Sequence, residues 1–231
     1  RDSLDIRVIL SSRKFLEKVE ILEIGDLEDQ ILLLEDFRQK ISFWDKISGF
    51  VLAHKSKKSI TKWLKLDNIQ KNDPAVILFT SGTESYPKAV PLSHNNILSN
   101  HRGSLEAIKL NTSDILYGVL PPFHSFGFSV TGLLPLLSGL RVFYAPDPTD
   151  AHAMAQDCFS KSITMIGCAP SFYRNLFHVA SPIQLQQLRL IVSGAEKAHP
   201  ELFEYAKKYK KLMIEGYGIT ECSPIVSINK L

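Results

Sequence analysis

The sequence predicts an α/β fold in which mostly parallel sheets are covered by helices. Short apolar runs rich in β-branched residues alternate along the chain with amphipathic stretches, an order typical of strands joined by crossover helices. Several runs, such as Ala75–Phe79, are apolar at every position, which indicates strands buried on both faces. The chain has 231 residues, of which 45% are hydrophobic and 22% charged, so it can build a substantial core.

The expected strands are the apolar runs at Ile6–Leu10, Ala75–Thr80, Leu116–Leu120, Arg141–Ala145, Ile163–Cys168, Leu188–Ser193 and Leu212–Glu215. Helices are expected at Leu34–Lys40, Asp45–Leu64, Thr149–Ser160, Ser171–Val179 and His199–Tyr209, and from a cap at Ser93 to about Ile108. The polar segment Lys65–Pro74 separates an N-terminal part, residues 1–70, from a main α/β region, residues 71–231.

Charge and cysteine content indicate the environment in which the protein works. The net charge of +3 gives no sign of a nucleic-acid partner, and none is expected. Cys158, Cys168 and Cys222 lack the close spacing of a zinc or redox motif, and free thiols suit a reducing, cytoplasmic compartment. Residues 115–140 contain no Asp, Glu, Lys or Arg, but three prolines interrupt them. A buried strand, loop and helix in series fit this stretch better than a transmembrane helix.

Hydroxyl, glycine and lysine side chains are concentrated in Thr80–Lys88, which reads TSGTESYPK and directly follows a predicted buried strand. Such a loop can direct backbone N–H groups and hydroxyls at phosphate oxygens, while the lysine adds positive charge. It is not a Walker A loop, because no glycine precedes Lys88 and no Ser or Thr follows it. An ordinary strand-to-helix turn also favours Ser, Thr and Gly, so composition alone leaves both interpretations open.

Four motifs resemble, in order, signatures of the adenylate-forming superfamily, which includes acyl-CoA synthetases, luciferases and peptide-synthetase adenylation domains. TSGTESYPKAV is similar to TSGTTGxPKG, and LPPFHSFGF at Leu120–Phe128 resembles the P-x-F-H segment. SGAEK at Ser193–Lys197 resembles the adenine-side loop, and EGYGITE at Glu215–Glu221 resembles Y-G-x-T-E. The exact residues SGTE, FHSFG, SGAEK and EGYGITECSPIVSIN, together with SSRKFLEK near the start, point to one branch of the superfamily. They resemble acyl-(acyl carrier protein) synthetases fused to 2-acylglycerophosphoethanolamine acyltransferases.

The resemblance implies an AMP-forming acid-thiol ligase that uses ATP and Mg²⁺. It would activate a fatty acid to an acyl-adenylate for transfer to acyl carrier protein or CoA, serving phospholipid acylation. The fold implied is a fragment of the large N-terminal domain, with residues 1–70 as its N-terminal part and residues 71–231 as the ATP- and acyl-binding region. A hinge-linked C-terminal domain is expected to be absent, so we expect weak nucleotide binding and no complete turnover. The full-length protein is expected in the cytoplasm or at the cytoplasmic face of a membrane, with which it could associate.

The resemblance also assigns roles to individual residues. The β- and γ-phosphates would be held by Thr80, Ser81, Gly82, Thr83, Glu84 and Lys88. Adenine would be flanked by Gly216, Tyr217 and Gly218 on one side and by Gly194, Ala195 and Glu196 on the other. Thr220 would contact the α-phosphate, Glu221 would bind Mg²⁺, and His124 would orient the acyl carboxylate. We expect His124, Thr220, Glu221 and Lys88 to be the catalytic residues.

Simpler roles exist for these residues when each is taken alone. Glu221 could be an acid favoured by a helix start, Tyr217 could be core, and His124 could be a satisfied buried histidine. An acyl chain needs a dry slot with one polar mouth, and the wall is expected to include Phe126, Gly127, Phe128, Cys168, Ala169 and Pro170. Plain core packing explains each of these wall residues equally well.

Two other functions remain as alternatives. The family glycines are replaced by Ser85 and Ala89, which would suit a degenerate, non-catalytic nucleotide-binding module. His152 and Asp157 match the H-x-x-x-x-D spacing of a glycerophospholipid acyltransferase. However, residues five apart on a helix diverge by roughly 140° around its axis, which disfavours a paired role.

Overall fold

The computed structural model describes residues 6–18, 29–80 and 87–229. Contacts between residues divide the chain into two compact units, Arg1–Ile69 and Gln70–Leu231.

The first unit contains a short parallel pair of strands followed by helices. β1 (Ile9–Ser11) pairs with β2 (Ile31–Leu33), and Ile9 lies opposite Ile31. The first predicted strand, Ile6–Leu10, therefore begins three residues later than expected. Helix α1 (Arg13–Lys18) follows β1, and α2 (Leu34–Lys40) follows β2 with the predicted bounds.

The single helix predicted over Asp45–Leu64 is wrong, because the segment forms two helices. These are α3 (Phe43–Ala53) and α4 (Lys57–Trp63), followed by a 3₁₀ turn, η2 (Leu66–Asn68). Ser42 and Asp45 form a capping box at the start of α3. Ser56 starts a second helix, because its side chain accepts a hydrogen bond from the Ser59 N–H at 3.2 Å and so satisfies a backbone donor that a helix start leaves free.

The second unit begins with a hairpin rather than with a strand of the main sheet. β3 (Pro74–Thr80) pairs antiparallel with β4 (Lys88–Ser93), and only Leu78 of β3 is fully buried. This corrects the prediction that Ala75–Phe79 is buried on both faces inside a parallel sheet. Leu78 packs with Leu92 and with Ile97 of helix α5 (His94–Ala107). The sequence did not reveal β4, because Pro91 lies within it, and proline is unusual in a strand away from a sheet edge.

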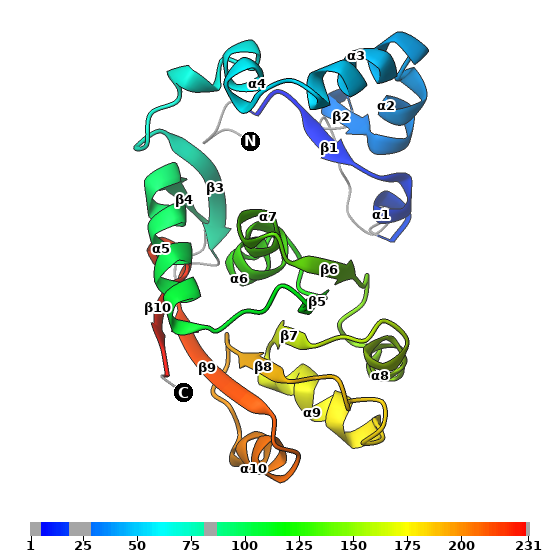
Figure 1. The fold of residues 1–231 in the computed structure, drawn as a ribbon, viewed down its shortest axis with the longest axis vertical. Helices are drawn as coiled ribbons and strands as arrows, with labels where there is room; N and C mark the ends of the chain where they lie inside the picture. The colour runs from blue at the N-terminus through cyan, green and yellow to red at the C-terminus, as the bar shows by residue number, and fades with distance from the viewer. Residues whose placement is uncertain (1–5, 19–28, 81–86, 230–231) are drawn as a thin grey trace. The chain divides into compact units, whose positions relative to one another are not determined.

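A six-stranded sheet forms the centre of the second unit and confirms the predicted α/β fold (Figure 1). Its order is β10-β9-β8-β7-β5-β6, and every neighbouring pair is parallel except β9 with β10. The strands are β5 (Ile115–Gly118), β6 (Arg141–Tyr144), β7 (Met165–Cys168), β8 (Leu190–Ser193), β9 (Leu212–Gly218) and β10 (Ile225–Ile228).

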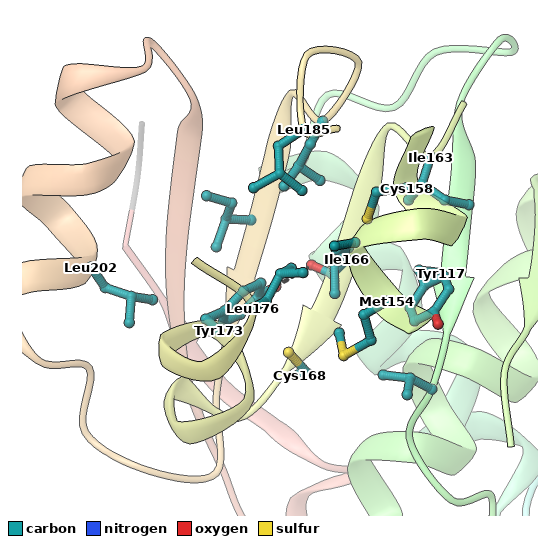
Figure 2. Close-up of a cluster of buried hydrophobic side chains, with 14 of the residues drawn as sticks. Tyr117, Met154, Cys158, Ile163, Ile166, Cys168, Tyr173, Leu176, Leu185 and Leu202 are labelled. Carbon is teal, nitrogen blue, oxygen red and sulfur yellow. Dashed lines mark hydrogen bonds between the residues drawn. The ribbon is translucent and has the colours of Figure 1, made fainter. Parts of the chain in front are cut away.

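Alternate residues of the central strands point to opposite faces of the sheet, and each face has its own core. On one face, Tyr117, Ile166 and Ile191 pack with three helices. These helices are α8 (Ala151–Ser160), α9 (Pro170–Val179) and α10 (Pro200–Lys208). Figure 2 shows this cluster, with Tyr173 and Leu176 of α9 turned toward the strands. The neighbouring residues Leu116, Met165 and Leu190 face the other way.

The uncharged stretch 115–140 forms a strand, a loop and short helices in series, as predicted. Its strand, β5, belongs to the sheet, and the short helices cover the second face. After β5 come α6 (Ser125–Gly127), the π-helical turn η3 (Phe128–Leu133) and α7 (Leu134–Ser138). Val130 and Leu134 pack against Met165 and Val192 of the sheet. Gly139, with φ of 72°, ends α7 in the left-handed conformation. Within residues 6–18, 29–80 and 87–229, no helix has the length and apolarity needed to cross a membrane.

A buried ion pair fixes the start of two strands. Asp114 precedes β5 and Arg189 precedes β8, and their side chains are 1% and 31% exposed. Arg189 Nε donates to Asp114 Oδ1 at 2.8 Å, and Arg189 Nη2 donates to the other carboxylate oxygen. Burial raises the pKa of Asp114, but hydrogen bonds from Arg189, Asn111 and Thr164 and the charge of Arg189 outweigh it and leave the pKa below its ordinary value.

Candidate functional site

A cavity opens at the carboxyl ends of β8 and β9, the edge at which open α/β sheets commonly bind ligands. The cavity has an empty volume of about 880 Å³, which includes space open to solvent. Three of the four motifs meet here. Their lining residues are His124, Ser125 and Phe126 after β5, Ser193, Gly194 and Ala195 after β8, and Gly216, Tyr217 and Gly218 at the end of β9.

His124 stands at the rim of this cavity and is exposed. It precedes α6 as the N-cap residue, and its Nδ1 atom accepts a hydrogen bond from the Phe126 N–H at 3.4 Å. The ring is therefore held from one side while its other nitrogen can reach a ligand. This exposure does not fit the alternative that His124 is a satisfied buried histidine.

The turn after β8 brings the backbone of Gly194 and Ala195 to the cavity. The Gly194 N–H donates to Cys168 O at 3.3 Å, which holds the turn against β7. Ala195 adopts a left-handed conformation with φ of 70°, which is strained for a residue with a Cβ atom. The hydroxyl oxygen of Ser193, at the end of β8, is buried and has no hydrogen-bond partner within the described parts of the chain. Glu196 is exposed and accepts a bond from Ser171 Oγ at 3.3 Å.

Tyr217 lines both the cavity and a second, more open hollow of about 1080 Å³. The residue is 62% exposed, so the alternative that Tyr217 is packed core does not hold. Ala195, Gly216 and Gly218 border both spaces as well. Glu196 lines the second hollow, opposite the strand that carries Tyr217. The Tyr217 ring and the backbone of Ala195, Gly216 and Gly218 thus border a space that suits a planar group.

The loop after β9 carries Thr220 and Glu221 and is closed on itself. Its Ile219 N–H donates to Pro224 O at 2.8 Å, and the Ser223 N–H donates to Thr220 O at 3.2 Å. A Cβ atom on Gly218 would lie 2.5 Å from Pro224 O, so glycine is required there. Thr220 and Glu221 form the 3₁₀ turn η4 (Thr220–Cys222), in which Glu221 is exposed and Thr220 is half-buried.

The two ends of the predicted phosphate loop lie opposite each other. Thr80 ends β3, Lys88 begins β4, and the two residues pair in register. Ser81, Gly82, Thr83, Glu84 and Ser85 lie outside the described residues. The loop therefore joins two strands, not a strand and a helix as the simpler interpretation supposed. Ala89, which replaces a family glycine, lies in an extended strand opposite Phe79 and not in the left-handed region, so it brings no backbone strain.

The position of β4 relates Lys88 to the loop after β9. β4 packs beside η4, and α5, which follows β4 directly, packs beside β10. Lys88 is exposed at the start of β4. The hairpin that carries the phosphate loop and the turn that carries Glu221 are therefore neighbours within the second unit.

The apolar wall of the cavity differs in part from the predicted acyl wall. Phe126 lines it, but Phe128 packs toward the hairpin with Leu78 and Leu92, and Gly127 lies against Pro121 O. The Cys168 side chain belongs to the core on the opposite face, and Ala169 and Pro170 begin α9 there. The apolar lining comes instead from α5 and the residues that follow it, from η3 and α7, and from the sheet face that carries Met165. These residues are Leu105, Ile108, Leu110, Val130, Leu134, Met165, Val192, Ile214, Ile225 and Ile228.

A partial signal for this wall was present in the sequence. Phe126, Val130 and Leu134 follow each other at four-residue spacing, which places them on one side of a helix. The contribution of α5 had no such signal, nor had the buried pair of His101 and Ser129, whose Nε2 and Oγ atoms are 3.1 Å apart. Burial holds the pKa of His101 below its ordinary value, so this lining residue is neutral at pH 7.

The residues present fit a Mg²⁺ ion that arrives with a nucleotide. Among the described residues, no three His, Cys, Asp or Glu side chains gather into a metal site. Glu221 nevertheless offers one exposed carboxylate on η4, which packs beside β4 of the hairpin. Mg²⁺ is commonly held by one or two carboxylates together with substrate phosphates and water, and this arrangement suits it.

The residues of the acyltransferase alternative are not brought together. Asp157, on α8, accepts a hydrogen bond from Tyr117 OH at 3.0 Å beneath the helix. His152, on the same helix, is exposed. The two side chains thus face different surroundings, as their spacing indicated.

Comparisons with known proteins agree with these features. The chain is 32% identical over 167 residues to the acyl-CoA synthetase ALT10 of Alternaria alternata, covering 71% of this chain and 29% of that protein. It is 32% identical over 161 residues to the medium-chain fatty-acid–CoA ligase of Escherichia coli, covering 67% and 28%. The crystal structure of ATP-bound MatB from Rhodopseudomonas palustris superposes with a TM-score of 0.62 at 26% identity, covering 70% and 32%.

The chain thus spans between 28% and 32% of the length of these three proteins. The model of one protein family, described as AMP-binding enzyme, matches residues 9–231, nearly the whole sequence. The chain therefore belongs to the family of AMP-binding enzymes.

Proposed function

We propose that this chain contributes the ATP- and acyl-binding part of a ligase that converts a fatty acid and ATP to an acyl-adenylate and pyrophosphate. The observation that supports this proposal most directly is that three of the four sequence motifs line one cavity. His124 lies at its rim, and Tyr217 lies between two glycines. In this proposal residues 71–231 form the ATP- and acyl-binding region, and residues 1–70 form the N-terminal part of the same domain.

The roles proposed for the residues follow their positions. Tyr217 and the backbone at Gly194 and Ala195 face the same space and would hold adenine between them. Thr220 would donate to the α-phosphate, and Lys88 would offset the charge on the departing pyrophosphate. Mg²⁺, held by Glu221 and the phosphates, supplies further charge stabilisation when bound.

His124 would orient the acyl carboxylate. A carboxylate oxygen attacks the α-phosphorus, and the bond to pyrophosphate breaks. The residues named here bind, align and neutralise charge, and no proton has to move in that step.

The apolar wall supports a fatty acid as the substrate. Aliphatic side chains from α5, η3 and the sheet dominate the lining. Polar groups come from His124, Ser125 and the turn after β8, and also from His101, Ser104 and Ser129 on the side of α5 and η3. A dry slot with one polar mouth suits a ligand with an alkyl tail and a carboxylate head. The relatives named above include a medium-chain fatty-acid–CoA ligase, in keeping with such a ligand.

The thiol acceptor is proposed from the sequence motifs and the relatives. The acyl-CoA ligases among the relatives favour CoA. The wording SGTE, SGAEK and EGYGITECSPIVSIN favours acyl carrier protein and a role in phospholipid acylation. We propose transfer to one of these two thiols in the cytoplasm or at the cytoplasmic face of a membrane. Supplying each thiol in turn to the full-length protein and measuring thioester formation separates them.

The first test is calorimetric binding of a non-hydrolysable acyl-sulfamoyl-adenosine to the chain. The analogue joins adenosine to an acyl tail and so fills both halves of the proposed cavity. We expect binding that weakens roughly tenfold for every two methylene groups removed from the tail, because each buried CH₂ contributes about 0.8 kcal/mol. Lys88→Ala and Glu221→Ala test the phosphate side with ATP and Mg²⁺.

Matched controls separate a specific site from general surface binding. Lys207→Ala and Glu204→Ala remove charges of the same kind at exposed positions on α10, outside the proposed site. They should leave both ligands bound as in the unaltered chain. A folded chain that binds neither the analogue nor ATP would overturn the proposal and would favour a degenerate module.

A further inference from the structure

Asn100, in the middle of α5, makes three hydrogen bonds to the loop that follows β9. Its Nδ2 atom donates to Cys222 O at 3.0 Å and to Ile225 O at 2.7 Å. Its Oδ1 atom accepts from the Ile225 N–H at 3.3 Å. The amide thus uses both donor hydrogens and its oxygen on backbone groups more than 120 residues away in the sequence.

These bonds hold the loop at two places on either side of the left-handed turn at Ser223. Cys222 ends η4, the turn that contains Thr220 and Glu221, and Ile225 begins β10. The loop is also closed by its own backbone hydrogen bonds, from the Ile219 N–H to Pro224 O and from the Ser223 N–H to Thr220 O. These bonds hold its residues together as one unit. The Asn100 amide therefore sets where the whole loop sits against α5.

The first turn of α5 follows directly from β4, which forms with β3 the hairpin that carries the predicted phosphate loop. Ser93 ends β4 and forms a capping box with Asn96 at the first turn of the helix. Lys88 begins the same strand. A strand, a capped helix start and less than two helical turns therefore connect Lys88 to Asn100, with no intervening loop.

We propose that Asn100 is a positioning residue that fixes Thr220 and Glu221 relative to Lys88, and so sets the spacing between the α-phosphate contact, the metal ligand and the pyrophosphate contact. This inference rests on the proposed function, because it assigns Asn100 a role only if those three groups bind ATP. Asn100 is not one of the residues that line the cavity or the second hollow. It acts through the backbone of the loop.

The chemistry of the amide makes the proposal specific. Alanine would remove all three bonds and leave Cys222 O, Ile225 O and the Ile225 N–H without this partner. Aspartate would keep the oxygen that accepts from the Ile225 N–H but would turn a carboxylate oxygen toward two carbonyl oxygens. We therefore expect aspartate, although nearly the same size, to displace the loop more than alanine does.

The experiment measures affinities of Asn100→Ala, Asn100→Asp and the unaltered chain for acyl-sulfamoyl-adenosine and for ATP with Mg²⁺. Circular dichroism gives the folded fraction by which each affinity is corrected. We expect alanine to weaken both ligands about tenfold, and aspartate to weaken them further, because small misplacements of a site lower binding of charged groups strongly. The ratio of affinities for long and short acyl tails should stay within about twofold, because the apolar slot is unchanged.

Asn95→Ala is the matched control, since Asn95 is exposed on the first turn of the same helix. It should bind both ligands as the unaltered chain does. A purely structural role for Asn100 would lower the melting temperature and leave the corrected affinities equal, and that result would overturn the inference alone. Failure of the unaltered chain to bind either ligand would overturn the proposed function and this inference with it.

Discussion

The hydroxyl of Thr220 donates a hydrogen bond to the hydroxyl of Ser125 over 3.1 Å. Ser125 is 8% exposed and directly follows His124, so the bond ties the loop after β9 to the segment after β5. In the proposed reaction, Thr220 contacts the α-phosphate and His124 contacts the carboxylate. The hydrogen bond thus links the two segments that carry Thr220 and His124, between which the new acyl-phosphate bond would form.

Replacing Ser125 by alanine should loosen this connection. Thr220 would lose its acceptor, and the loss of one partly buried hydrogen bond costs about 1 kcal/mol of stability. We expect affinity for acyl-sulfamoyl-adenosine to fall about three- to tenfold, measured by calorimetry. Ser138→Ala is the control, because the hydrogen bond that Ser138 Oγ makes in the described structure goes to Leu134 O of its own helix, α7. Equal affinity for Ser125→Ala and the unaltered chain would contradict the proposed support.

Glu221→Gln should separate metal binding from stability. The side chain is exposed, so the free energy of unfolding should change by less than about 0.5 kcal/mol. Binding of ATP should require more Mg²⁺, because the neutral amide is a weaker ligand for a hard cation. Titrating ATP at several MgCl₂ concentrations measures this. Binding of acyl-sulfamoyl-adenosine, which needs no metal, should not change, and Glu204→Gln provides a surface control.

Ala195→Gly should stabilise the protein. A left-handed conformation costs an alanine about 1 kcal/mol relative to glycine, part of which is offset by the greater freedom of glycine in the unfolded chain. We expect the free energy of unfolding to rise by about 0.5 kcal/mol in urea denaturation. The same change at an exposed helical position, Ala153→Gly on α8, should lower it by about 1 kcal/mol. If Ala195→Gly is destabilising, the strain assigned to this turn is absent.

Acid should weaken the fold through Asp114. The pKa of this carboxyl is lower in the folded protein than in the unfolded chain, so the ionised form favours folding. That stability is present above the unfolded pKa of about 4 and is lost as pH falls through the lower folded value. Asp114→Asn should lower stability by about 2–4 kcal/mol at pH 7, because it leaves Arg189 without its charged partner.

Urea denaturation from pH 7 to pH 2.5 checks this prediction. The difference in unfolding free energy between Asp114→Asn and the unaltered chain should be constant near neutral pH and shrink below pH 4. Asp67→Asn, at a position outside any buried pair in the described structure, should follow the unaltered chain. A constant difference at all pH values would show that the ionised form of Asp114 does not matter.

Most of the central sheet could be predicted from the sequence for a local reason. In β5, β7 and β8 both faces are buried, so the runs containing Leu116, Ile166 and Ile191 are apolar. The helices between them show apolar residues at helical spacing, and caps such as Ser93 mark their starts. These signals come from neighbouring residues, and the sequence therefore determined the order along the chain of the parallel strands in the main sheet and the motif residues at their ends.

The tertiary structure decided which segments far apart in sequence meet. The apolar run Ala75–Phe79 is compatible with a central strand or a hairpin, and the pairing of β3 with β4 settled this. Strand alternation shows that Cys168 and Gly167 face opposite sides, but only packing shows that the cavity lies on the side away from Cys168. The bonds of Asn100 to Cys222 and Ile225 likewise have no local signature. Such contacts depend on how the elements together bury apolar area and satisfy backbone groups, which no single stretch of sequence specifies.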